Sequence, residues 1–260
     1  TAGTSNYIAG VNAGNSIASG GNYNVTVGDE AGTAITTGDE NTLVGYVAGD
    51  AITTASFNTA IGSNAGTANT SGSQNTFVGR YAGAATTEGA NNVVVGSGAF
   101  STATTGDDNT AVGKGALNAN TTADNNTAVG RDALLVNTTG TPNTAVGYNA
   151  MAANTTGTNN VAVGSGALDA NTTASANTAV GRDALTTATT AANNTAIGNY
   201  SQGATTTGAG NTSVGSDSMA ANTTGASNTA VGHSALVANT TGATNVAVGD
   251  TALDANTTGS

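Results

Sequence analysis

Residues 109–130 read NTAVGKGALNANTTADNNTAVG, so the motif Asn-Thr-Ala-Val-Gly that ends at Gly113 returns, ending at Gly130, 17 residues later. The glycine that closes this motif recurs at the same interval through fourteen copies, from Gly28 to Gly249, without an insertion or deletion. Residues 6–10 read as a fifteenth copy that is offset by one residue. An unbroken period of this length predicts a stack of equivalent coils.

A column is the set of residues at one position of the repeat, and each column is named here by its member in residues 109–125. The Asn109 column is Asn in all fourteen copies, the Val112 column is always Val or Ile, and the Ala111 column is Ala in nine. Thr, Val and Ile favour strands, so the motif predicts a short strand. Successive strand residues face opposite ways, which places Ala111 and Val112 on different faces, both apolar. Such a strand is buried on two sides, and only one side can be the interior of its own coil. The other face therefore needs a partner.

A second apolar segment follows the glycine. The Ala116 column is Ala in twelve copies and Ser in two, and the Leu117 column is Leu, Met or Phe in nine. We expect this segment to be the return limb of the coil and to hold a second short strand. Helix is disfavoured, because Thr, Val and Gly are frequent and the apolar residues follow no 3.6-residue period. The predicted fold class is all-β, a parallel β-solenoid or β-roll of about fifteen 17-residue coils.

Constant polar columns predict ladders that run from coil to coil. Identical Asn amides can hydrogen-bond along a stack, Thr hydroxyls can do the same, and the Val column stacks apolar groups. The expected structural ladders include Asn109, Asn126 and Asn143, Val112, Val129 and Val146, and Thr121, Thr138 and Thr155.

We interpret residues 1–260 as a single continuous repeat domain, and as a fragment of a longer protein because both ends fall inside the repeat. The composition shifts near residue 96, because the first four copies carry Gly32, Gly49, Gly66 and Gly83 where later copies carry a large apolar residue. The shift indicates either two subfamilies of one solenoid or a change of diameter or partner.

Charge and composition exclude several partners. The formal net charge is −11, which repels nucleic acid and anionic lipid, and no apolar run is long enough to span a bilayer. Cysteine is absent, so disulfides and thiolate metal sites are excluded. Aromatic residues make up 3% of the chain, so order must come from repetition rather than from a core of large side chains.

The unit NTAVGRDAL at residues 126–134, followed by NTTG at 137–140, resembles the Asn-Ser-Val-Ala-Ile-Gly head repeats of trimeric autotransporter adhesins (the YadA-like β-roll). It is also similar to Asn-Thr-Ala-Val-Gly arrays of phage tail fibres and tail-fibre-like bacterial surface proteins. The resemblance covers nearly the whole chain. It implies left-handed parallel β-rolls in which three chains pack around one axis, and an extracellular location on a bacterial surface or a virion fibre. The repeat departs from the adhesin pattern in being longer and constant in length.

Large functional side chains gather at one corner of the coil, directly after the repeat glycine or, for Tyr81 and Tyr200, one position later. Variable residues on a repetitive scaffold often serve recognition, although a well-solvated corner also tolerates bulk. The candidate contact corner comprises Tyr46, Arg80, Tyr81, Lys114, Arg131, Tyr148, Arg182, Tyr200 and His233.

We find no pattern that predicts catalysis, a metal site or a cofactor. The chain has one His and no Cys, and neighbouring carboxylates such as Asp107 and Asp108 point apart in a strand instead of sharing a cleft. Acidic residues occupy no constant column, unlike those of calcium-binding β-rolls. The glycosylation sequon occurs at Asn120 and Asn222, but nothing indicates a eukaryotic secretory route.

Three functions remain open. The leading one is a structural and adhesive shaft or head of a trimeric fibre, with a cell-surface or matrix receptor as partner. A self-polymerising extracellular filament is the second, because a solenoid exposes open strand edges. An ice-binding solenoid is the third, although the adjacent Thr121 and Thr122 columns would face opposite ways in a strand.

Overall fold

The structure is a computed structural model that describes residues 3–260. Short parallel strands joined by turns make up these residues, and no helix occurs among them. The predicted class, an all-β parallel β-solenoid with one coil per 17-residue repeat, is therefore confirmed. The chain divides into two compact units, Thr1–Arg131 and Asp132–Ser260.

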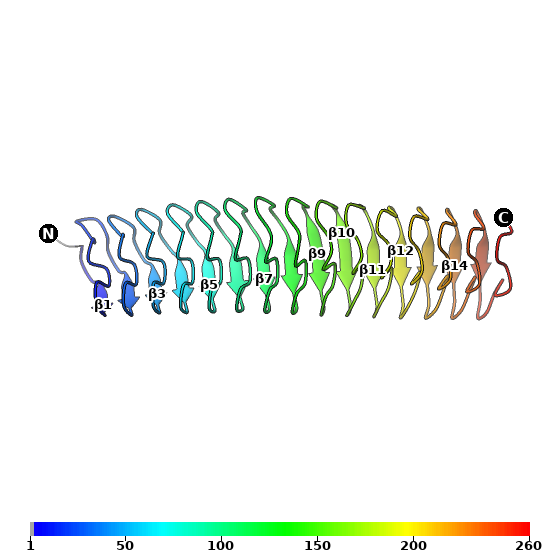
Figure 1. Ribbon diagram of the computed structural model, residues 1–260, viewed down its shortest axis with the longest axis horizontal. Helices are drawn as coiled ribbons and strands as arrows, with labels where there is room; N and C mark the ends of the chain where they lie inside the picture. Colours follow the sequence, from blue (N-terminus) through cyan, green and yellow to red (C-terminus); the bar gives the residue numbers. More distant parts are fainter. Residues whose placement is uncertain (1–2) are drawn as a thin grey trace. The chain divides into compact units, whose positions relative to one another are not determined.

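Each coil contributes one strand, and within each unit each strand pairs in parallel with the strand of the following coil (Figure 1). The first unit holds β1 (Tyr7–Ala9), β2 (Val25–Val27), β3 (Thr42–Val44), β4 (Thr59–Ile61), β5 (Thr76–Val78), β6 (Val93–Val95), β7 (Thr110–Val112) and β8 (Thr127–Val129). The second unit holds β9 (Asn143–Val146), β10 (Asn160–Val163), β11 (Thr178–Val180), β12 (Thr195–Ile197), β13 (Thr212–Val214), β14 (Thr229–Val231) and β15 (Val246–Val248).

The pairing register keeps every column in line. Between β7 and β8, Ala111 lies opposite Ala128 and Val112 opposite Val129, so like residues stack. Between β1 and β2 the partners are 18 residues apart, as in the pair Ala9 and Val27. The predicted fifteenth copy and its one-residue offset are thus confirmed.

The expectation of two strands per coil is wrong. The return limb after each glycine is a run of turns, because two of its positions adopt left-handed backbone angles that no strand accommodates. Leu117, for example, has φ 50° and Gly115 has φ 70°. Coil-to-coil backbone hydrogen bonds nevertheless continue through the limb, as from Phe100 N–H to the Ala116 carbonyl at 2.9 Å.

The two faces of each strand differ in burial. Ala111 lies in the coil interior with no exposed surface, whereas its neighbours Thr110 and Val112 are half-buried on the outside. The same alternation holds in other coils, where Val95 and Val129 are 37% and 36% exposed. The Val column is therefore stacked in register, but on the outer side of the sheet.

The composition shift near residue 96 is a change in how the same interior is filled. In early coils the glycine column makes room for large side chains from other columns: a methyl group on Gly32 would lie 2.8 Å from the side chains of Ile35 and Leu43. Phe77 fills the corresponding space beside Gly66 and Gly83. In later coils Leu117 occupies the interior directly, and the strand contributes the small Ala111. The large side chain of each coil thus comes from different columns in the early and the late copies, while the interior stays filled.

The Asn109 column forms a buried ladder. The Asn109 N–H and Nδ2 both donate to the Asn92 side-chain oxygen, at 2.9 and 3.2 Å, and Nδ2 also donates to the Ala123 carbonyl at 2.9 Å. The same pattern places Asn126 N–H on the Asn109 oxygen at 3.0 Å. In the second unit Asn160 donates to Asn143 in the same way. Buried amides are satisfied by these bonds, which explains a polar column inside an apolar coil.

Two further polar columns join neighbouring coils. The Thr138 hydroxyl donates to the Thr155 carbonyl at 3.0 Å, so the Thr ladder runs through backbone oxygens rather than from hydroxyl to hydroxyl. A second amide ladder, not predicted from the sequence, includes the bond from Asn154 Nδ2 to the Asn137 oxygen at 2.8 Å. The recurrence of Asn in the motif Asn-Thr-Thr-Gly, as at Asn137 and Asn154, is the sequence feature that could have predicted this second ladder.

Candidate functional site

All nine residues of the candidate contact corner are exposed and follow the carboxyl end of a strand. In the first unit they are Tyr46 after β3, Arg80 and Tyr81 after β5, Lys114 after β7 and Arg131 after β8. In the second unit they are Tyr148 after β9, Arg182 after β11, Tyr200 after β12 and His233 after β14. They lie in a row along each unit because every coil places this position at the same corner.

Contacts within the corner are local. The Arg80 guanidinium lies over the Tyr81 ring, 4.7 Å from its centroid, and Arg182 forms an ion pair with the adjacent Asp183. No pocket is present in residues 3–260. The corner therefore suits contact with another surface better than enclosure of a small molecule.

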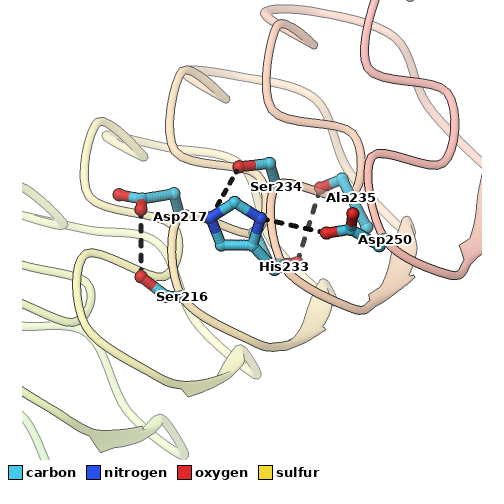
Figure 2. A network of polar contacts seen from close by, with 7 residues as sticks. Ser216, Asp217, His233, Ser234, Ala235 and Asp250 are labelled. Carbon is cyan, nitrogen blue, oxygen red and sulfur yellow. Dashed lines mark hydrogen bonds and ion pairs between the residues drawn. The ribbon is translucent and has the colours of Figure 1, made fainter.

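Figure 2 shows a polar network around His233 in the second unit. His233 Nδ1 lies 3.0 Å from an oxygen of Asp250 in the next coil, and the Ser234 hydroxyl lies 3.5 Å from Nε2. These three residue types also compose hydrolytic triads, but catalysis further requires a shorter Ser–His contact and an oxyanion-binding site beside it. His233 and Asp250 are 61% and 76% exposed, and the arrangement provides no concave site for a substrate. The expectation that this chain is not an enzyme stays a prediction.

The interior of the second unit contains a group of buried polar side chains where other coils hold apolar ones. Gln202 donates to the Thr195 carbonyl at 2.9 Å and to the Ser213 hydroxyl at 3.0 Å, and Ser213 also contacts Ser201. The Gln202 oxygen is buried without a partner. This group is sealed inside the coil, so it has no access to a ligand.

Acidic residues flank the strands at the end opposite the contact corner. The Asp107 carboxylate accepts the Ala90 N–H at 2.7 Å, and Asp124 accepts the Asp107 N–H at 2.8 Å. This column thus links coils through Asp, Ser or Asn oxygens where it is polar, and its signal in the sequence is weak because five of its fourteen members are Ala. Asp108, beside it, is exposed, and the structure shows no partner for its carboxylate.

A uniform surface runs along each unit on the outer sheet face, defined as the Thr110 and Val112 columns of the strands. Its members are Thr or Val in the Thr110 column and Val or Ile in the Val112 column throughout β2–β15. No charged residue occurs among these described positions. An uncharged, regularly spaced face of this kind is a candidate surface for association.

Burial raises the pKa of the Asp169 carboxyl above its ordinary value, and the nearby Asp183 carboxylate raises it further. Asp169 lies on the return limb after β10. Its surroundings favour the neutral form because two carboxylates share a partly buried region.

Within residues 3–260, no group of three or more His, Asp or Glu side chains is arranged to hold a metal ion. None of the described segments forms a helix with the length and apolar character needed to cross a membrane. The sequon residues Asn120 and Asn222 are fully buried, and their amides donate to the Ala123 and Gly225 carbonyls at 3.0 Å. Neither amide is accessible for glycosylation in the folded coil.

Comparison with protein-family models, curated proteins and solved structures finds no match to this chain.

Proposed function

We propose that this chain is a structural and adhesive segment of an extracellular fibre, in which copies associate through the outer sheet face, most simply as a trimer. The observation that carries the proposal is the uncharged Thr and Val face, repeated in register on successive coils. The resemblance of the Asn-Thr-Ala-Val-Gly repeats to adhesin heads and tail fibres supports the same reading.

Association would remove the half-exposed valines from water. Val112 and Val129 lie on this face at the same position of adjacent coils, and their equivalents continue along each unit. Burial of apolar surface contributes about 25 cal/mol per Å², so many modest contacts add to a stable interface. The contact corner at the edge of the face would then remain available to a receptor.

The first test is the absolute mass in solution by light scattering. We expect an assembly of about three times the 24.5 kDa chain mass. The double variant Val112→Lys with Val129→Lys should dissociate it, because association would bury two added charges per chain. Thr105→Lys with Thr122→Lys adds the same charge at exposed positions of the return limb and should leave the assembly intact. A wild-type monomer at all concentrations would overturn the proposal.

Ice binding is a second candidate, favoured by one observation. The strand threonines Thr110 and Thr127 are aligned on the outer sheet face, where a regular array of hydroxyl and methyl groups can order water. Thr121 and Thr122 are less suitable, because they lie in a turn and Thr121 is half-buried. Thermal hysteresis of a monomeric sample would favour ice binding over a fibre, and its absence would dismiss it.

A further inference from the structure

The apolar interior of the second unit is interrupted between Ala196 and Met219. In the coil before this segment the interior is filled by fully buried apolar side chains, among them Ala184 and Leu185. From residue 197 to residue 218 no hydrophobic side chain is buried. The core then resumes as a cluster of buried residues, Met219, Ala230, Ala235, Leu236 and Ala247.

Polar side chains fill the interrupted part of the interior. Ser201, Gln202 and Ser213, here named the polar layer, occupy the columns that hold Ala, Leu and Ala in the preceding coil. All three are fully buried, and the Gln202 oxygen has no hydrogen-bond partner to offset its removal from water. The polar layer therefore replaces favourable apolar contacts between coils with an incompletely satisfied polar group.

The second amide ladder is interrupted in the same part of the unit. It reaches Asn171, whose Nδ2 donates to the Asn154 oxygen at 2.7 Å, but the next two members of this column are Ala188 and Thr205. The Asn171 oxygen is left buried without a partner. On the other side of the interruption, Asn222 Nδ2 lies 3.4 Å from the Thr205 hydroxyl, a long contact. The apolar core and the second ladder thus both weaken here.

Backbone pairing and the first amide ladder keep the segment closed. β12 and β13 pair in parallel register, and the Asn211 N–H donates to the Asn194 side-chain oxygen at 2.9 Å. The stability of a solenoid depends on its individual coils and on the interfaces between neighbouring coils. Cooperative unfolding is therefore expected to divide where an interface is weakest, and in the second unit that interface lies at the polar layer.

We infer that the polar layer is a joint built into the second unit, at which residues 212–260 open and unfold while the coils before the layer stay folded. The inference does not depend on association between copies. It gives the polar side chains a conformational role, because they confine opening to one part of the unit.

The first unit offers an internal comparison. The column of the second ladder is interrupted there too, at Thr86 and Ala103. Phe77 and Phe100, however, are buried in the neighbouring interior, so the apolar core is continuous past this interruption. We therefore expect no joint at this place, and the polar layer rather than the missing amides should determine where a unit opens.

Hydrogen exchange at three equivalent amides tests the inference in the wild-type protein. The N–H groups of Thr178, Thr212 and Thr229 each donate to an Asn backbone carbonyl of the next coil at 2.8 Å, so their local hydrogen bonds are alike. Exchange would be followed by mass spectrometry of peptides from β11, β13 and β14 at increasing urea concentrations. Thr212 and Thr229 should exchange together, at least about tenfold faster than Thr178 and with the smaller urea dependence of a partial unfolding.

Two results in this experiment would overturn the inference. The first is exchange of all three amides at one rate, which would mean that the unit unfolds as a whole. The second is a gradual increase in rate towards the end of the chain, with Thr229 clearly faster than Thr212, because that is the pattern of fraying. Rapid exchange around Thr86 would also contradict it, since missing ladder amides would then be sufficient for opening.

A variant with the apolar interior restored provides a second readout. Ser201→Ala, Gln202→Leu and Ser213→Ala together should slow the exchange of Thr212 and Thr229 at least about tenfold and leave Thr178 unchanged. The control is Thr207→Ala, at an exposed position of the same coil whose hydroxyl makes no hydrogen bond in the structure, and it should change none of the three rates. A difference between Thr178 and Thr212 that persists in the folded triple variant would exclude the polar layer as its cause.

Discussion

The Asn92 side-chain oxygen accepts hydrogen bonds from both the backbone N–H and the side-chain amide of Asn109, one coil further on. Each buried asparagine in this ladder thus accepts hydrogen bonds from the following coil and donates hydrogen bonds to the preceding one. The stability of one coil is therefore coupled to that of its neighbours.

Asn109→Ala should lower the free energy of unfolding by about 1 to 3 kcal/mol, because the N–H of Asn126 loses its acceptor in a buried site. Chemical denaturation measures the change. Asn199→Ala, at an exposed position whose side chain makes no hydrogen bond in the structure, is the control and should stay within about 0.5 kcal/mol of the wild type. Equal losses in the two variants would contradict the ladder's role.

Gly96→Ala should be severely destabilising, by about 3 kcal/mol or more, because its φ is 147° and an added methyl group would collide with the Gly113 carbonyl. Gly98, two residues later, has φ 65° and open space around it, and its column holds Asn64 and Asn149 in the same conformation. Gly98→Asn should therefore be nearly neutral. Thermal unfolding of the two variants compares these positions within one coil.

Phe77 and Gly83 share one space inside the coil, so the effects of substituting them on the free energy of unfolding should be strongly coupled. Phe77→Ala should cost about 3 to 5 kcal/mol by leaving a cavity. Gly83→Leu alone should also destabilise, since its side chain would enter the space of the Phe77 ring. The double variant reproduces the Ala and Leu arrangement of Ala111 and Leu117 and should cost clearly less than the sum. A double-mutant cycle measures this coupling, and strict additivity would contradict it.

The buried polar group around Gln202 should be dispensable for stability. Gln202→Leu with Ser213→Ala restores the apolar pattern of other coils and removes a buried oxygen without a partner. We expect the double variant to be neutral or more stable by about 1 to 2 kcal/mol. A large loss in denaturant unfolding would show that the polar group stabilises this coil.

The raised pKa of Asp169 predicts that the stability of the fold depends on pH. Because its folded pKa is raised, the folded state holds the proton more tightly, and stability falls as pH rises from the unfolded pKa through the folded one. Asp169→Asn should therefore increase the melting temperature at neutral pH. The gain should disappear below the ordinary pKa of 3.8, where the carboxyl is protonated in both states. A gain of equal size at both pH values would point to another cause.

The sequence predicted the period, the strand at each Asn-Thr-Ala-Val-Gly motif and the offset copy, because these depend only on repetition and alternation. It could not assign the faces, since Ala111 and Val112 are both apolar and alternation alone does not tell inside from outside. The second strand was wrongly expected because Leu117 itself gives no local signal of a left-handed conformation. The signal lay in the early copies, where the same column holds Gly32, Gly49, Gly66 and Gly83 with φ between 54° and 60°. The contact corner was located as a column, but no residue pattern indicates what it binds.

The left-handed positions of the return limb have a spectroscopic consequence. With only three or four residues of each coil in β geometry, far-ultraviolet circular dichroism should resemble that of a poorly ordered chain. Amide hydrogen exchange should report the opposite, with slow exchange at the limb positions whose N–H groups donate to neighbouring coils, such as Phe100. A weak β signal from this protein is therefore no sign that it has failed to fold.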